Sequence, residues 1–383
     1  MKKIFLIMVI FLLSGCYNYK ELNKIGIVSS ISIDKKDNMY KVGAQVLNVK
    51  NKEDTSSSKV IVYQEKGKTI EEALRKMTTK SNKKLYGGHL GKLVISEDVA
   101  KESIINIVDL FQRLPEIKDE FTITVSRGID AFDVIKIMTS PESVPADYVS
   151  SEIETADIES ALTYSSKLDE FVSFYLKDYI DPSISVIKVD NYDKKGTTLK
   201  NNETTNPKTR IVLDNIAITK DGKLERYLDE NETIGYNFIR NRINEIIIPI
   251  KCDDNNYSSI SLIKSKTKDK IKKENNKYII NLDISSSASI NEYNCTKDLD
   301  KEKTIKFLEN RAEKQIKKYI NKVIKLQNNS KSEFLGFKRM IYLNDGRYNN
   351  EKYDIKIKVK VSISRKGDIR NSSKGEKYEY KNK

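Results

Sequence analysis

A short apolar segment at the start of the chain ends in a cysteine, and this arrangement favours covalent attachment of lipid. Lys2 and Lys3 precede an uncharged apolar run, residues 4–13, and the segment LSGC then ends at Cys16. The run is too short to span a hydrocarbon core of ~30 Å, and its flanks are typical of a secretory signal peptide. LSGC resembles a lipobox, in which a diacylglycerol is added to the cysteine thiol and the chain is cut before it. We therefore expect residues 1–15 to be a signal peptide and Cys16 to carry a lipid anchor. The alternatives are a plain signal peptide and an uncleaved hairpin, each with a chance cysteine.

Two further cysteines, Cys252 and Cys295, are a candidate disulfide pair. An exported protein meets conditions that permit disulfides, and closing this loop would stabilise the fold by roughly 4 kcal/mol in the chain-entropy model. The sequence does not show that the two Cβ atoms meet. Two buried free thiols are the alternative, to which we give slight preference.

Groups that could perform catalysis or hold a metal ion are scarce. His89, in the segment LYGGHLGKL, is the single histidine. A single histidine cannot form a histidine metal cluster, and a histidine-based triad would have to use His89. The sequence contains no P-loop, no GxGxxG after a strand, no HExxH and no CxxC. We expect its many carboxylates to lie on solvated, charged faces. The sequence therefore predicts no catalytic residue, no metal and no cofactor, and a protein that is not an enzyme.

The composition is that of a polar but folded protein with room for two or three domains. Of 383 residues, 38% are hydrophobic and 32% charged, and the formal net charge is +14. Removal of residues 1–15 takes away two lysines and no acid, which leaves +12. A basic lipoprotein has an anionic membrane surface within reach of its anchor. No Lys/Arg run interleaved with aromatic residues is present, so we do not expect nucleic acid as a partner.

The first half of the chain alternates strand and helix patterns, which predicts a mixed α/β layer. Residues 25–49 indicate a hairpin, Thr69 and Glu72 form a capping box, and Ser96 is placed to cap a helix that continues through Phe111. Further strands are expected at 60–65, 92–96 and 120–126, and further helices at 69–77, 129–138 and 168–179.

A polar stretch separates this half from the rest of the chain. Residues 191–209 contain almost no apolar residue, which predicts a linker between the regions 16–190 and 210–370. The second region begins with a hairpin about Asp221-Gly222 and ends in a strand, 355–364, whose alternate positions include Lys356, Lys358 and Lys360. Between them we expect long, antiparallel strands and a helix at 301–326. The tail 371–383 is typical of disorder. The lysine stripe is either a solvated sheet face or a dock for acidic lipid or a partner.

Seven segments along the chain carry a resemblance to a known family. They are GCYNYKELNKIGIVSSISID (15–34), GKTIEEAL (67–74), LYGGHLGKLVISEDVA (85–100), IVDLFQRLPEI (107–117), MTSPESVPADYV (138–149), IAITKDGKLERYLDENETIGYNFI (216–239) and SEFLGFKRM (332–340). With these segments the sequence resembles the Ger(x)C family, the lipoprotein C subunits of nutrient germinant receptors in endospore-forming bacteria. The resemblance spans nearly the whole mature chain in the expected order, although no single motif is diagnostic. Tyr17 stands where the family usually has Trp, Ser32 stands where a Gly often precedes the ID pair, and His89 matches a position in the GHL stretch.

This resemblance implies both a fold and a function. The fold is a mixed α+β arrangement of three domains with mixed sheets flanked by helices. The function is that of a lipid-anchored subunit, on the outer face of the spore inner membrane, that works with integral-membrane A and B subunits in nutrient-triggered germination. A non-enzymatic coupling or scaffolding role fits the absence of catalytic motifs. The alternatives from other classes are a solute-binding lipoprotein of a transporter and, third, an envelope enzyme.

Overall fold

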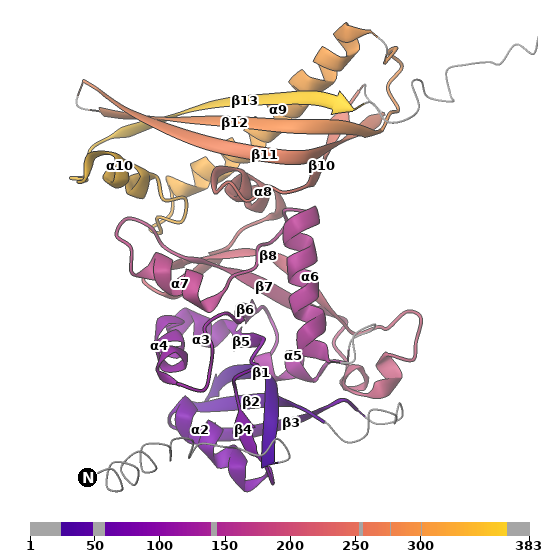
Figure 1. The fold of residues 1–383 in the computed structure, drawn as a ribbon, viewed down its shortest axis with the longest axis vertical. Helices are drawn as coiled ribbons and strands as arrows, with labels where there is room; N and C mark the ends of the chain where they lie inside the picture. Colours follow the sequence, from indigo (N-terminus) through magenta and orange to yellow (C-terminus); the bar gives the residue numbers. More distant parts are fainter. Residues whose placement is uncertain are drawn as a thin grey trace, which may run out of the picture.

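The structure, a computed structural model, describes residues 24–48, 58–138, 144–252, 256–275, 277–299 and 301–365. The expected signal peptide, Cys16 and the tail 371–383 lie outside these described residues. Two sheets, one near each end of an elongated molecule, organise the described chain (Figure 1). The expected mixed α+β class is thereby confirmed, and the described strands form no third sheet that would mark a third domain.

The N-terminal sheet has nine strands in the order β3-β2-β1-β5-β6-β7-β8-β9, with β4 paired to β1. Its centre is parallel, because β1, β5, β6 and β7 run in one direction, and antiparallel hairpins lie at both ends. The predicted 25–49 hairpin is confirmed, with Asp37 and Asn38 at positive φ in its two-residue turn. The strands are β1 (Ile25–Lys36), β2 (Met39–Leu47), β3 (Val60–Gly67), β4 (Lys84–Tyr86), β5 (Lys92–Ser96), β6 (Thr122–Ser126), β7 (Ser183–Asp190), β8 (Arg210–Lys220) and β9 (Lys223–Tyr227).

Helices cover both faces of this sheet. One face packs its isoleucines and valines against α2 (Ile70–Lys76), α3 (Glu97–Glu102), α4 (Ile105–Arg113) and α7 (Leu168–Tyr175). The other face is covered by α5 (Ala131–Lys136) and α6 (Pro145–Glu159). Because alternate residues of a strand point to opposite faces, Leu93 and Ile95 of β5 face the first group, whereas Lys92 and Val94 face the second.

Local helix signals in this half are partly corrected. The Ser96 side chain makes no capping hydrogen bond, and the single helix expected after it is interrupted at Ser103 between α3 and α4. The Thr69 hydroxyl does accept from Glu72 N–H, but the Glu72 carboxylate accepts from Lys68 N–H instead of the cap residue. A short 3-10 turn, η2 (Met77–Thr79), follows α2.

Residues 191–209 connect neighbouring strands of one sheet. β7 and β8 flank this segment and pair antiparallel from Ser183↔Ile218 to Asp190↔Arg210. The segment carries two short 3-10 turns, η3 (Lys194–Thr197) and η4 (Leu199–Asn201). The segment that was expected to link two halves is thus a surface loop between two strands of the N-terminal sheet. Polar composition marks such a loop without telling which strands it joins. The sheets instead divide between β9 and β10.

The C-terminal sheet is built on one long hairpin. β10 (Ile246–Lys251), β11 (Tyr257–Glu274) and β12 (Lys277–Glu292) are antiparallel, and β13 (Tyr353–Arg365) adds parallel to β12. The predicted long strands are confirmed, although the parallel β13 makes the sheet mixed. The predicted long helix is α9 (Glu302–Gln327), which packs with α8 (Glu230–Ile239) and α10 (Phe337–Asp345) under the sheet.

A single apolar core joins the two sheets. It contains Ile216 and Ile218 of β8 and Tyr164 from the segment after α6, together with inward-facing residues of α8, α9 and β10–β13. Across the junction, the Asn237 side chain donates to the carbonyls of Ala161 and Thr163 at 2.8 and 3.2 Å. The C-terminal sheet is thus packed against β8 of the N-terminal sheet, whose other strands pack into two further clusters.

The helices of the described residues are too short or too polar to cross a bilayer; within these ranges the structure has no candidate membrane span.

Candidate functional site

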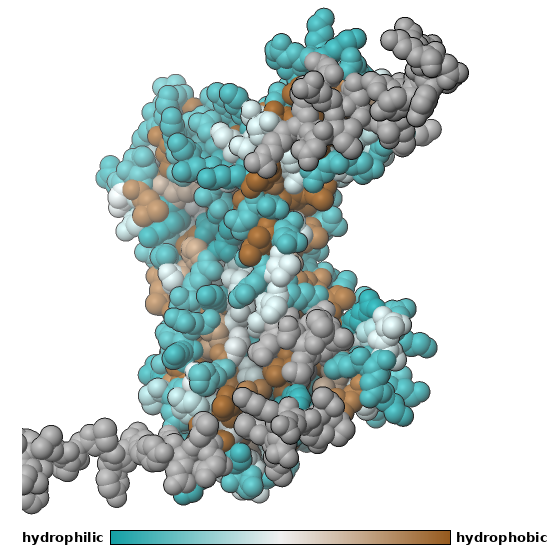
Figure 2. Space-filling view, turned by 45° about the vertical axis from the view of Figure 1, so that its right-hand side comes forward, coloured by the Kyte–Doolittle hydropathy of each residue, from teal (hydrophilic) through white to brown (hydrophobic). Residues whose placement is uncertain are grey.

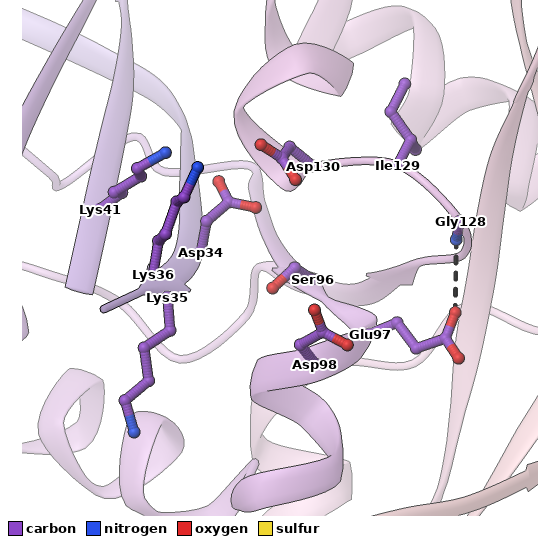
Figure 3. A pocket seen from close by; sticks show the side chains of 10 residues that line it. All are labelled: Asp34, Lys35, Lys36, Lys41, Ser96, Glu97, Asp98, Gly128, Ile129 and Asp130. Carbon is purple, nitrogen blue, oxygen red and sulfur yellow. Dashed lines mark hydrogen bonds between the residues drawn. The ribbon is translucent and has the colours of Figure 1, made fainter. Parts of the chain in front are cut away.

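A pocket of about 380 Å³ opens at the carboxyl ends of the parallel strands β1, β5 and β6 (Figure 3). In open α/β sheets this edge is where ligands bind, because the loops that leave the strands diverge there. Four segments build the walls: the end of β1, Lys41 of β2, the start of α3 and the turn that leads into α5. The lining residues are Asp34, Lys35, Lys36, Lys41, Ser96, Glu97, Asp98, Gly128, Ile129 and Asp130.

Asp34 is the most deeply placed acid of this pocket, with only 4% of its surface exposed. Its two carboxylate oxygens accept from the backbone N–H groups of Ala131, at 2.6 Å, and Phe132, at 2.9 Å. These are free donors of the first turn of α5, whose own cap residue Asp130 makes no side-chain bond. Burial raises the pKa of Asp34 to about 6, against the opposing effects of the two N–H groups and Lys41.

Acids and lysines face each other around the rest of the pocket (Figure 3). Glu97 accepts from Gly128 N–H at 3.3 Å and pairs with Lys101 at 2.6 Å. Although burial opposes it, the hydrogen bond from Lys101 holds the pKa of Glu97 below its ordinary value. On the β1 side, Lys35 forms an ion pair with Glu102. Such a lining could hold a small, charged or polar molecule.

The residues that line the pocket include no pair of a nucleophile and a histidine. A nucleophile needs an adjacent base, and the one hydroxyl of the lining, Ser96, has no histidine near it, because His89 is not among the lining residues. Within the described ranges, no group of three or more His, Cys, Asp or Glu residues is arranged to hold a metal ion.

A second unusual feature lies on the α5–α6 face of the same sheet. Lys92 of β5 is 1% exposed, and neither its Nζ nor Oε2 of Glu152 on α6 has a hydrogen-bond partner among the described residues. Burial lowers the pKa of Lys92 and raises that of Glu152, while each charge partly stabilises the other. A cavity of about 10 Å³ beside Lys92, also lined by Ser30 and Gln45, is of the size that holds one water molecule.

Of the residues singled out in the sequence, Cys252 and Cys295 are brought together, and His89 lies apart from them. Cys16 lies outside the described residues. Cys252 and Cys295 form a disulfide, with their Cα atoms 5.3 Å apart, in place of the two free thiols that were slightly preferred. The Ser258 hydroxyl lies 3.2 Å from both sulfurs. His89 is exposed in a turn, with its ring edge-on to Tyr86 at 6.3 Å.

Sequence reasoning missed two of the buried charged residues, Asp34 and Lys92. Each had a signal. Asp34 follows Ser30 and Ser32 on the polar side of the β1 alternation, directly after the last isoleucine, and Lys92 opens the apolar segment KLVIS. A charge at such a position is rarely fully buried unless it has a specific partner.

Comparison with known proteins agrees with this architecture. A family model described as the N-terminal domain of a spore germination protein matches residues 18–189, and one described as spore germination B3/GerAC like, C-terminal, matches residues 214–371. Spore germination protein KC of Bacillus subtilis (strain 168) is 25% identical over 350 residues, covering 88% of this chain and 86% of the relative. Spore germination protein GerQC of Bacillus cereus is 22% identical over 353 residues, which are 92% of each chain.

A solved structure has the same fold. The crystal structure of the GerBC protein matches with a TM-score of 0.54 at 18% identity, covering 87% of this chain and 96% of that chain. The two-sheet architecture and the matched segments thus define a protein of the spore germination class. The chain belongs to the Ger(x)C family, the family of C subunits of nutrient germinant receptors. This membership associates it with the bacterial spore.

Proposed function

We propose that this chain acts as a non-enzymatic coupling subunit of a nutrient germinant receptor. In this role it is anchored by lipid on Cys16 to the outer face of the spore inner membrane, beside integral-membrane A and B subunits. The observation that carries the proposal is the single apolar core that runs from β8 through α8 and α9 to β13. Close packing of this kind would carry a displacement of the C-terminal sheet to β8 of the N-terminal sheet, and coupling between distant partners requires such a contiguous connection.

Polar contacts at the junction support the same role. Arg242, which follows α8, forms an ion pair with Glu170 of α7 and stacks over the Tyr164 ring at 4.1 Å. A buried guanidinium held by both an acid and an aromatic face fixes the orientation of the elements that carry it. The subunit would then stabilise the assembled receptor and bias it between resting and triggered states. Coupling of this kind is typically worth about 1–3 kcal/mol, or roughly 5- to 150-fold in an equilibrium.

The lipid anchor rests on the sequence of the first sixteen residues. A diacylglyceryl cysteine supplies the two acyl chains that stable anchoring needs. Cys16→Ala should leave the protein uncleaved, or release it if the signal peptide is removed by another route. A Cys16→Ala protein that lacks its signal peptide and remains in the membrane fraction at the wild-type level would refute the anchor.

The role is tested with spores that lack this protein. They should not respond to nutrients, yet should release dipicolinic acid normally under nutrient-independent triggers. A second deletion strain that carries the gene elsewhere on the chromosome is the matched control and should respond like the wild type. Nutrient germination at the normal rate without the protein would remove the coupling role.

A solute-binding function is the second candidate, and the pocket at Asp34 is the observation that favours it. The test is isothermal calorimetry on residues 17–383 with amino acids, sugars and nucleosides at millimolar concentrations. The coupling role predicts no saturable binding. A saturable isotherm that disappears in a Lys41→Ala variant would transfer the chain to the solute-binding class.

A further inference from the structure

The outer face of the C-terminal sheet carries two parallel rows of lysines. β11 presents four of them and β13 three, and all seven are exposed. We call this set the lysine face; it consists of Lys264, Lys266, Lys268, Lys270, Lys356, Lys358 and Lys360. In the sequence, only the β13 row appears as a regular stripe. The β11 row lies about 90 positions earlier, and further charged residues around its lysines mask their alternation.

The strand register places the two rows on either side of β12. Lys266 of β11 lies opposite Ser285 of β12, which lies opposite Lys360 of β13. Asp283 and Asn281 likewise lie between two lysines, whereas Ser287 lies between Lys264 and Ser362. The β12 residues that lie between the two lysine rows are Asn281, Asp283, Ser285 and Ser287. With strands ~4.8 Å apart, the two lysine rows run about 9.6 Å from each other, and lysines within a row recur every ~6.7 Å. The face is therefore a shallow channel that is bordered by the two lysine rows, and β12 lines its centre with short side chains.

The charges of this face are only partly compensated. None of the seven lysines forms an ion pair with another described residue, whereas Lys273 and Lys277 of the same hairpin pair with Glu351 and Asp354. Asp283 is the only acid among the seven lysines and the four β12 residues between them. The spacing of the lysines is close to the ~8 Å screening length at physiological salt, so their fields add over the channel. Mutual repulsion opposes folding, and an anionic occupant would relieve it.

The surroundings leave the channel open but close the sheet edge next to it. The inner face of the sheet is occupied by the core on α8, α9 and α10. Along the outer edge of β13, the N–H groups of Val361 and Ile363 donate to Glu313 and Glu309 of α9 at 3.1 and 2.9 Å. A partner strand therefore finds the hydrogen-bonding positions of these residues taken, and the side-chain face remains for contact.

We propose that the lysine face binds an extended, acidic segment of a partner protein, which lies in the channel over β12. An extended polypeptide repeats its side chains every ~6.7 Å on one side. Acids at alternate positions of such a segment therefore match the spacing of the lysines along each row. The lysine face lies at the opposite end of the molecule from β1, the strand that follows the expected anchor at Cys16 (Figure 1). A membrane that holds Cys16 would thus face the other end, which favours a protein occupant over the lipid surface.

The experiment measures binding of fluorescein-labelled poly-L-glutamate of about 20 residues to the full-length chain in non-ionic detergent, by fluorescence anisotropy. The test variant combines Lys266→Glu, Lys268→Glu, Lys358→Glu and Lys360→Glu. Since exposed ion pairs each change an equilibrium by a few-fold, four reversals should weaken binding roughly 100-fold. Lys→Gln at the same four positions should weaken it by about 10-fold while the melting temperature stays equal or rises, because repulsion is removed.

The matched control reverses four exposed lysines of α9, at Lys303, Lys314, Lys318 and Lys325, and so changes the net charge by the same amount. It should bind like the wild type. Equal binding by the wild type and both lysine-face variants would overturn the proposal. So would an equal loss in the α9 control, which would indicate net charge alone. Vesicles containing phosphatidylglycerol and a 20-nucleotide single strand are competing probes, and stronger face-dependent binding of either one than of polyglutamate would assign the channel to that class instead.

Discussion

The carboxylate of Asp34 accepts a 2.6 Å hydrogen bond from the backbone N–H of Ala131, a residue 97 positions further along the chain. The start of α5 is therefore satisfied by a strand residue on its flank and not by its own cap residue Asp130. This bond ties β1 to α5 at the floor of the pocket in Figure 3. It also buries a carboxylate in a place where its protonation affects the stability of the fold.

Replacing Asp34 by Asn should flatten the pH dependence of stability. Burial raises the pKa of Asp34 from 3.8 to about 6, so the folded state binds more protons than the unfolded state between these values. Stability therefore falls as the pH rises through this interval, by roughly 3 kcal/mol from this group. Urea unfolding at half-unit pH steps measures the effect as the difference between the two proteins. Asp37→Asn, at an exposed site in the same hairpin, is the control and should keep the wild-type slope. An Asp34→Asn protein with that slope would contradict the assignment.

Replacing one member of the buried pair of Lys92 and Glu152 should lower the free energy of unfolding more than replacing both members. Glu152→Leu leaves the ammonium buried without its acid, which should destabilise the fold by about 3 kcal/mol. The double variant Lys92→Met with Glu152→Leu should be neutral, or more stable than the wild type by about 1–4 kcal/mol. Guanidinium unfolding of the two single variants and the double variant completes the cycle. Additive effects would show that the two side chains do not interact.

Gly222 is predicted to tolerate no side chain, for two separable reasons. Its φ is +72°, and an added Cβ would lie 2.9 Å from Ile105 and 3.1 Å from the Tyr175 ring. Gly346 has φ +70° and nothing within 4 Å of such an atom, so it isolates the backbone effect. Gly346→Ala should cost about 1 kcal/mol and Gly222→Ala about 1–3 kcal/mol more. Equal losses of stability in the two variants, measured by thermal unfolding, would indicate that a side chain at position 222 does not clash with α4 and α7.

The disulfide between Cys252 and Cys295 should be a main stabiliser of the C-terminal sheet. It joins the segment after β10 to the segment after β12 across a sequence separation of 43 residues. Cys252→Ala with Cys295→Ala should lower the free energy of unfolding by about 4 kcal/mol under oxidising conditions. The wild type with reductant should approach the variant, whereas the variant should be insensitive to reductant. A wild type that reductant does not affect would argue against the bond.

Limited proteolysis should cut first within residues 191–209. This loop is mostly exposed and has few buried side chains, which are the features of preferred cleavage sites. Because β7 and β8 on either side of the loop pair over eight positions, the two fragments should stay associated after the cut. Size-exclusion chromatography of the nicked protein measures this. Fragments that separate without denaturant would support an interdomain linker, and first cleavage within 92–140 would refute the exposed loop.

The sequence alone determined the elements whose signals are local. Residues a few positions apart specify the hairpin at 25–49, the Asp221-Gly222 turn, the alternation of β13 and the 3/4 spacing of α9, and all appear where they were expected. Turn chemistry and side-chain period act over such short distances, so they survive almost any tertiary context. The ordered segments that resemble the Ger(x)C family were equally visible, and they carried the family assignment.

The tertiary structure alone decided which distant residues meet. The pairing of β7 with β8, the Asp34–Ala131 bond and the alignment of the β11 and β13 lysines about 90 positions apart all depend on strand order. The burial of Lys92 depends in the same way on which helix covers its face of the sheet. Strand order is chosen by the burial of apolar surface over the whole chain, which no short window of sequence records.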